Sequence, residues 1–273
     1  MAYIIGIDVG GSTTKIVGME AGRIVSPMFI TATDPVTSLF GAFGKYLYDN
    51  GIRLTDVERV MLTGVGSAFI NEPLYGLPTR KVDEFIANGL GARHATDLSQ
   101  LLVVSMGTGT SFVRLDGDHI HHIGGVGIGG GTLQGLSRLL LKTGDFRRIA
   151  EIAEQGDVTH INLQIGDISN RALPDLPMYA TASLFGKADS NATFADIAKG
   201  IICMVLQTIG GATVLAALNT DIKDFVLIGN LTQLPQCREI FSNMERIYHV
   251  RFHIPPYAEY RTAIGAALEQ GDT

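Results

Sequence analysis

One unit of sequence occurs twice in this chain, and the repetition constrains the fold more than any other feature. Residues 4–25 read as an apolar strand, a glycine-rich turn with hydroxyl side chains, a second apolar strand, an acid-glycine turn and a third strand. Residues 101–123 repeat that order. The glycines of the turns at 8–14 and 107–111 let the backbone approach an anion, to which N–H groups and hydroxyls donate. Two such hairpins predict two lobes that grip one phosphate chain.

Composition narrows the possible partners. The chain has 273 residues, of which 46% are apolar and 18% charged, so it can bury a sizeable core. Its net charge of −6 lacks the basic excess that nucleic acid or an anionic membrane requires, so we expect neither partner. Cys203 and Cys237 are far apart in the sequence and form no CxxC, which fits a reducing compartment. The N-terminus reads directly into a strand without a cationic leader, so we expect a cytoplasmic protein.

One segment tests the expectation that no membrane is involved. Residues 200–220 carry no charge and are long enough to raise the possibility of a membrane span. Gln207, the Gly210–Gly211 pair and the polar flanks favour a helix that is buried in the core or contributes to a dimer.

Further glycine turns follow each hairpin. Six of the eight residues 124–131 are glycine, and a helical leucine pattern comes next, so a third anion site is expected at that helix N-terminus. The buried strand 224–229 ends in a fourth turn, Gly229-Asn230. A meander followed by alternating helices and strands, performed twice, predicts an α/β fold with two similar lobes. Apolar spacing predicts strands at 57–62, 79–82 and 250–254, an irregular stretch at 163–190, and helices at 36–50, 83–96, 145–155, 194–218, 234–244 and 259–269.

Glu84 is the candidate general base on position alone. With Asp83 as N-cap, Glu84 falls in the first turn of a helix, near the mouth of a cleft if the adjoining strands are parallel. A carboxylate there can remove a proton from an acceptor hydroxyl, although Asp83 could exchange roles with it. The alternative is a carboxylate that only favours the helix dipole.

The motifs carry a family likeness that covers nearly the whole chain. They resemble the actin, heat-shock chaperone and sugar kinase superfamily and, within it, the type II pantothenate kinases. The resemblance implies two duplicated actin-like (ribonuclease H-like) lobes with an ATP cleft between them. The lobes would comprise residues 1–98 and 99–273, and the closing helix 259–269 could pack back on the first lobe. The matching segments are GIDVGGSTTK, VDEF, MGTGTS, VGIGGGTLQGL, EIAEQGDV, VLIGN and AIGAAL.

The resemblance also implies roles for individual residues. Asp8 would hold Mg²⁺, Phe146 would pack beside the nucleotide, and Asn230 would lie near the adenosine. Glu84 would be the general base. The residues that would wrap the ATP phosphates are Asp8, Val9, Gly10, Gly11, Ser12, Thr13, Thr14 and Lys15. Those expected to form the second phosphate turn and to lie along the nucleotide are Thr108, Gly109, Gly130, Gly131, Thr132, Leu133 and Gln134.

The implied activity is transfer of a phosphoryl group from ATP to pantothenate, at the start of coenzyme A synthesis, by a homodimer. One departure concerns the acceptor: His121-His122 stand where the family has an arginine that meets the acceptor carboxylate. Histidine lacks the permanently charged, bidentate fork of arginine, so His122 would hold a carboxylate less firmly. A different alcohol or a sugar is therefore an alternative acceptor, and a degenerate nucleotide sensor is a further alternative.

The sequence also bears on an ATPase switch and on a metal site. The opening Gly6–Lys15 also resembles the ATPase activators of hydroxyacyl-CoA dehydratases, which bridge a dimer through a cysteine-held iron–sulfur cluster. Neither cysteine of this chain lies in a comparable glycine-rich loop. Of the three clustered histidines, His119 and His121 would share one strand face while His122 points to the other, so a transition-metal site is not expected.

Overall fold

The computed structural model describes residues 2–11, 13–31, 34–171 and 176–270. Its first sheet has the strand order β3-β2-β1-β4-β5. The first three strands form an antiparallel meander, and β4 and β5 continue the sheet in parallel. The strands are β1 (Tyr3–Val9), β2 (Thr13–Glu20), β3 (Arg23–Thr31), β4 (Val57–Thr63) and β5 (Thr79–Lys81).

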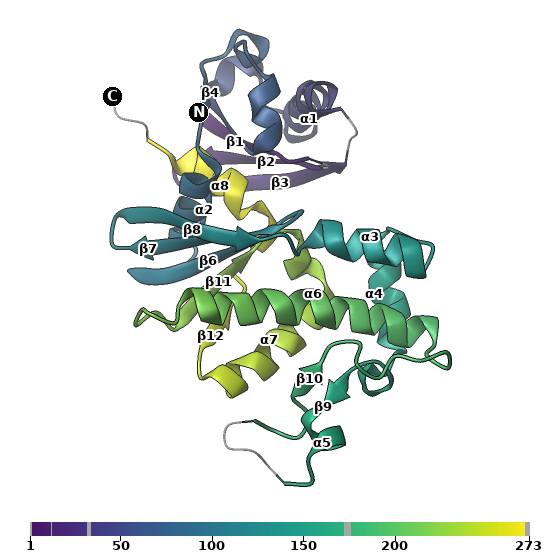
Figure 1. Ribbon diagram of the computed structural model, residues 1–273. Coiled ribbons are helices and arrows are strands. Elements are labelled where there is room, and N and C mark those ends of the chain that lie inside the picture. Colours follow the sequence, from purple (N-terminus) through teal and green to yellow (C-terminus); the bar gives the residue numbers. More distant parts are fainter. Residues whose placement is uncertain (1, 12, 32–33, 172–175, 271–273) are drawn as a thin grey trace.

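The second sheet repeats this plan. Its order, β12-β11-β6-β7-β8, again joins an antiparallel meander to two parallel strands. The repetition confirms the predicted α/β fold with two similar lobes (Figure 1). The strands are β6 (Gln100–Met106), β7 (Thr110–Asp116), β8 (His119–Val126), β11 (Asp224–Ile228) and β12 (Arg251–His253).

Helices cover the sheets and enclose separate cores. On the first sheet, α1 (Pro35–Asn50) buries Leu39, Phe43 and Tyr46, and it ends at Gly51 in the left-handed conformation, as the Asn-Gly pair predicts. On the second sheet lie α6 (Phe194–Ala216) and α7 (Pro235–Tyr248) (Figure 1). The remaining helices and strands are α2 (Glu84–Arg93), α3 (Gly130–Leu140), α4 (Phe146–Glu154), α5 (Ile165–Ile168), α8 (Arg261–Leu268), β9 (Leu163–Gln164) and β10 (Thr181–Ser183).

Helix α6 contains most of the uncharged segment that is long enough to raise the possibility of a membrane span. By length and composition it could cross a membrane, but 56% of its apolar window is buried inside the protein. Ile201, Leu206 and Ile209 are fully buried in the core of the second lobe. This packing is that of a core helix.

Helices α2 and α8 cross between the two sheets at very close range. A Cβ on Gly91 would come within 2.0 Å of Arg261 O, and a Cβ on Gly265 would come within 1.8 Å of Ala87 O. Only glycine permits this approach of the two backbones. Helix α8 also packs Ala263 and Ala267 against Gly6 of β1, so the end of the chain returns to the first sheet (Figure 1).

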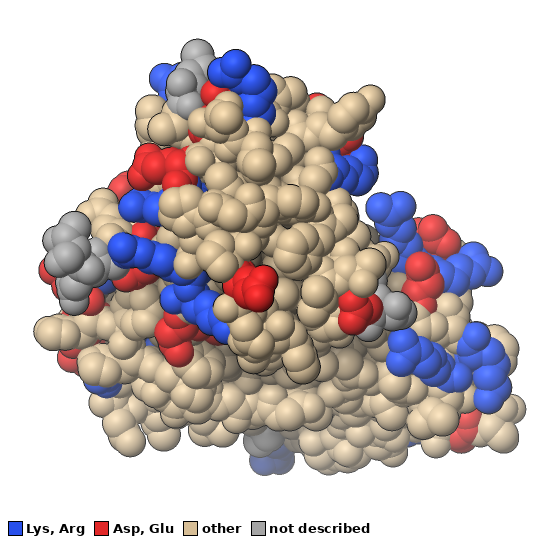
Figure 2. All heavy atoms as spheres, turned by 90° about the horizontal axis from the view of Figure 1, so that it is seen from above, with Lys and Arg blue, Asp and Glu red and all other residues tan. Residues whose placement is uncertain are grey.

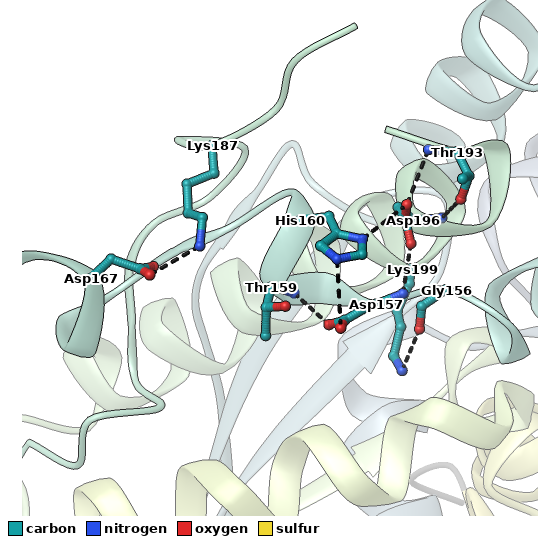
Figure 3. Close-up of polar contacts among 9 residues, drawn as sticks. All are labelled: Gly156, Asp157, Thr159, His160, Asp167, Lys187, Thr193, Asp196 and Lys199. Carbon is teal, nitrogen blue, oxygen red and sulfur yellow. Dashed lines mark hydrogen bonds and ion pairs between the residues drawn. The ribbon is translucent and has the colours of Figure 1, made fainter. Parts of the chain in front are cut away.

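A polar network ties the segment after α4 to the start of α6 (Figure 3). The Asp196 carboxylate, 4% exposed, accepts from Asp157 N at 2.7 Å and from Thr193 N at 3.0 Å. Lys199 Nζ donates to Gly156 O at 2.9 Å. Position 156 requires glycine, because a Cβ there would meet Ala195 O at 2.2 Å. The EQGD motif is thus explained by the packing of this segment onto α6.

Candidate active site

The first glycine turn joins β1 to β2 and places two charged side chains in the interior. Asp8 and Lys15 are paired across the strands and are 9% and 5% exposed. Lys15 Nζ lies 3.6 Å from Asp8 Oδ2. A lysine this deeply buried is not a solvated strand residue. It supplies a fixed positive charge beside the turn.

The other residues of this turn differ in how far they are buried. Gly10 N donates to Thr13 O at 2.9 Å, which closes the turn, and Gly11 is exposed. The Val9 side chain is fully buried in the core of the first lobe, so only its main chain can line a ligand. Thr14 is also buried, with its hydroxyl 3.3 Å from Ser38 Oγ. Ser12 lies outside the described residues.

The second turn and the start of α3 form one unit. Gly130 N donates to Gly107 O at 2.8 Å, and Gly131 N donates to Thr108 O at 2.9 Å. A Cβ on Gly129 would come within 2.7 Å of Gly109 Cα, so the glycine run is needed for this contact. The structure therefore brings the predicted residues of two separate motifs together at one helix N-terminus, where the helix dipole favours an anion although Gly130 N and Gly131 N already donate to the second turn.

The side chains along α3 have distinct surroundings. Thr132 Oγ1 accepts from Gly129 N at 3.3 Å, and Gln134 Nε2 donates to Gly144 O at 3.1 Å. The Leu133 side chain is fully buried in the core of the second lobe, which leaves its main chain for any ligand contact. Phe146 at the start of α4 lies against α3, because a Cβ on Gly130 would be 3.2 Å from Phe146 Cζ.

Asn230 follows β11 at the edge of the same unit. Gly229 has a φ of 98°, and a Cβ there would meet Met106 O at 2.5 Å. This glycine turn places half-buried Asn230 next to the end of β6, from which the second turn begins.

Glu84 opens α2 in a desolvated position. Burial raises its pKa to about 7, and the negative charge of Asp8 adds to the effect while Lys15 opposes it. Asp83 is the N-cap: its Oδ1 accepts from Phe85 N at 2.8 Å and Ile86 N at 3.0 Å. Because Asp83 is engaged in capping the helix, its position favours Glu84 as the candidate base.

His122 on β8 contacts the same helix turn. Its ring stacks on Phe85 with centroids 3.8 Å apart and planes 9° apart. His122 therefore contacts the residue that follows Glu84, where the second sheet meets α2, and its side chain is exposed. The sequence marks Phe85 only as part of the VDEF segment, because its contact with His122 depends on how α2 packs across β8.

The structure gives no support to a transition-metal centre. His119 and His121 lie on one face with ring centroids 6.0 Å apart, as predicted. Within the described part of the chain, no group of three or more His, Cys, Asp or Glu side chains could hold a metal ion. Asp8 suits Mg²⁺ differently, because this ion keeps several waters and takes one or two carboxylates plus phosphate oxygens. Asp8 Oδ1 faces Gly64, where a Cβ would come within 2.5 Å, so open backbone adjoins the carboxylate.

A separate cavity of about 610 Å³ lies between α6, α7 and the β9–β10 ribbon. It is lined by Lys199, Cys203 and Gln207 among others, and by none of the predicted site residues.

Comparison with known proteins places the chain in a family. The model of the family described as Fumble matches residues 88–267. The chain belongs to the Fumble family.

Two curated relatives of this Fumble protein carry the name type II pantothenate kinase. One, from Staphylococcus epidermidis, is 29% identical over 97% of this chain and 97% of its own length. The other, from Staphylococcus aureus, is 28% identical over 83% of this chain and 84% of its own length. These relatives support a kinase function.

Solved structures show the fold at lower identity. The activator of the 2-hydroxyisocaproyl-CoA dehydratase from Clostridium difficile, with bound ADPNP, has a TM-score of 0.70 at 17% identity and covers 97% of this chain and 93% of that one. A ROK family glucokinase from Streptomyces griseus, in complex with glucose and AMPPNP, has a TM-score of 0.60 at 14% identity and covers 97% and 98%. Both likenesses confirm the two-lobed actin-like architecture.

Proposed function

We propose that this protein is an ATP-dependent kinase that phosphorylates pantothenate to 4′-phosphopantothenate. The observation that carries the proposal is the position of the half-buried Glu84 carboxylate at the start of α2, where it interacts with both members of the buried Asp8–Lys15 pair; partial burial there raises its pKa to about 7. A base with a pKa near the working pH combines a useful ionised fraction with a sufficient drive to accept a proton. The names of the relatives supply the acceptor.

The predicted residues divide three tasks in this reaction. Main-chain amides of the two glycine turns hold phosphate oxygens, apart from those that already donate within the protein, such as Gly10 N, Gly130 N and Gly131 N. Lys15 offsets the charge that develops on the transferred group. Glu84 accepts the proton of the acceptor hydroxyl. Mg²⁺, which Asp8 would hold through water, neutralises phosphate charge when it is bound.

The test is a direct assay with ATP and pantothenate, with the product identified by mass spectrometry. Glu84→Gln should lower kcat by about 10²-fold or more, the range of general base catalysis, and leave the KM for ATP within about twofold. Glu154→Gln on the exposed side of α4 is the matched control and should be unchanged. Unaltered turnover by Glu84→Gln would remove this residue from the role. No product from the parent would exclude pantothenate, and ADP release with other alcohols and sugars would then identify the acceptor.

The assembly and location also belong to the proposal. We infer a cytoplasmic homodimer to which α6 contributes, since Phe194 on α6 and Leu215 near its end remain 64% and 70% exposed. A monomeric mass in solution would contradict this. Nucleic acid is not a proposed partner: on the face in Figure 2, lysines and arginines form separate groups among acidic and uncharged residues.

The likeness to a dehydratase activator does not favour an ATPase switch with an iron–sulfur cluster. Cys203 and Cys237 are both buried, and burial raises the pKa of their thiols to about 11 and about 12. Neither thiol is at the surface, where a cluster shared between subunits would need it. We expect purified protein to be colourless and free of iron.

A further inference from the structure

Helix α2 runs opposite to β8 where it packs on the second sheet. A Cβ on Gly89 would come within 2.7 Å of Ile120 Cγ2 of β8. One turn earlier in the helix, Phe85 stacks on His122, which is two residues later in β8. The first residue of the helix, Glu84, therefore lies toward the row of the sheet that follows His122.

Two serines of that next row face α2. Ser105 of β6 pairs with Ser111 of β7 in antiparallel register. Side chains two residues apart on a strand share a face of the sheet. Val103 and Val113, each two residues from one of the serines, pack with Phe85 in one cluster. Both serine side chains therefore point to the side of the sheet on which α2 lies.

Helix α2 ends before it covers this row. Val103 and Val113 are fully buried, whereas Ser105 and Ser111 are half-buried. Neither serine hydroxyl has a hydrogen-bond partner among the described residues. On β8 the row continues with Gly125, which adds no side chain. The row is thus an open ledge with two unpartnered hydroxyls, which we call the serine shelf.

The serine shelf lies between the groups that the proposed reaction brings together. The second phosphate turn begins at Gly107, two residues after Ser105, which is about 7 Å along a strand. His122, the expected contact of the acceptor carboxylate, belongs to the preceding row, where it pairs with Val113. Glu84 opens the helix that ends at the shelf. An acceptor that reaches from His122 to the phosphate turn therefore passes over the shelf.

We propose that Ser105 is a specificity residue for the acceptor, its hydroxyl forming a hydrogen bond with the polar group that follows the reacting hydroxyl along the acceptor. In pantothenate this group is the secondary hydroxyl. The inference rests on the proposed function. Strand β7 separates Ser105 from β8, so Ser105 lies further than Ser111 from His122 and meets the middle of the acceptor. The shelf thus selects alcohols that carry a second hydroxyl close to the reacting one.

Ser105→Ala is the first test. It should raise the KM for pantothenate about fivefold, the equivalent of one hydrogen bond between uncharged groups, while the KM for ATP stays within about twofold. A half-buried hydroxyl without a partner contributes little to folding, so the urea midpoint should be unchanged. Ser242→Ala, on the exposed side of α7, is the matched control and should leave both KM values unchanged. A parental KM for pantothenate in Ser105→Ala would overturn the proposal.

An analogue of pantothenate that lacks the secondary hydroxyl identifies the contact. The parent should have a KM for this analogue about fivefold above that for pantothenate. Ser105→Ala should raise the KM for the analogue no further, because the hydrogen bond is already lost. An equal rise in KM for the analogue and for pantothenate would contradict the assignment.

Failure of this inference and failure of the proposed function are distinct results. If the parent phosphorylates pantothenate and Ser105→Ala keeps the parental KM, the kinase assignment stands and the role of Ser105 falls. If the parent gives no product, the acceptor is wrong, and Ser105 is tested on the alcohol or sugar identified by ADP release. The KM for that acceptor should also rise about fivefold in Ser105→Ala. An unchanged KM there would overturn the inference.

Discussion

At the residue scale, the proposed kinase activity depends on the ionisation of Glu84. Its carboxyl lies at the start of α2, where burial and Asp8 disfavour the charged form more than Lys15 supports it. The group must lose its proton before it can act as base. Its raised pKa therefore sets a pH range in which activity appears.

The pH dependence follows with a definite sign. Below a pKa of about 7 the carboxyl is protonated and inactive as base, so kcat/KM for the acceptor should rise about tenfold per pH unit up to that value and level off above it. Steady-state rates between pH 5 and 9 measure this limb. The limb should vanish in Glu84→Gln, and a flat profile in the parent would argue against Glu84 as base.

His122 offers a second prediction at this scale. Its ring stacks on Phe85 beside Glu84, and arginine can stack in the same place while offering a charged fork to a carboxylate. His122→Arg should lower the KM for pantothenate about tenfold, the gain expected from one charge-assisted pair. The KM for ATP serves as the internal control. An unchanged KM for pantothenate would show that position 122 does not contact the acceptor carboxylate.

Sequence could predict some of these residues and not others. Local spacing was enough to predict the glycine turns and the place of Glu84 at the start of its helix, because caps and turns depend on neighbouring residues. Other features depend on packing between distant segments, which no local pattern reveals. This packing buries the Val9 and Leu133 side chains and brings Phe85 against His122. It also buries Thr63 Oγ1 and Asn88 Nδ2, which have no hydrogen-bond partner among the described residues.

At the element scale, the α2–α8 crossing leaves no room for a larger side chain at its glycines. Gly91→Ala would place a Cβ 2.0 Å from Arg261 O, a backbone atom that can move only if the chain around it shifts. We expect a loss of about 3 kcal/mol or more of stability, or failure to fold. Gly211→Ala in α6 is the matched helical control, since nothing lies within 4 Å of its Cβ position. It should gain up to about 1 kcal/mol from helix propensity. Urea unfolding compares the two, and equal effects would contradict the packing.

The contribution of Asp196, at the start of α6, to folding stability should fall at acid pH. The N–H of Asp157 is the chief cause that holds the pKa of Asp196 below its usual value, and the Thr193 contacts add to it. A lowered pKa means that Asp196 stabilises the fold above about pH 4 and loses that contribution as the pH falls further. Asp196→Asn should cost about 1–2 kcal/mol at pH 7 and progressively less below pH 4. A cost that stays constant down to pH 2, measured by urea unfolding, would contradict this.

Most elements were predictable because their signals are strong and local. The strands of both meanders and α1 fall where spacing and caps placed them. Boundaries were less certain: α2 ends at Arg93 rather than 96, and the last helix begins at Arg261 after a 3₁₀ turn. The stretch 163–190, expected to be irregular, holds the short β9–β10 ribbon, whose two-residue and three-residue strands leave no period to detect.

At the scale of the whole molecule, the repeated hairpin predicted the two lobes, and the repeated strand order confirms them. The manner of their joining was not predictable. The lobes are joined through glycines of α2 and α8, which are far apart in the sequence but in close contact in the fold. A glycine in a sequence does not indicate which segment it will contact. We propose that the active site lies at this junction, because α2 carries Glu84 and contacts β8 through Phe85.

The most direct test is a crystal structure with Mg²⁺ and a non-hydrolysable ATP analogue. We expect the phosphates to contact the amides of the 8–15 turn and of the 107–109 turn together, with the γ-phosphate nearest Lys15 and Glu84. Phosphates bound by neither turn, or bound by one turn with the other facing away, would contradict a phosphate site shared by the two lobes.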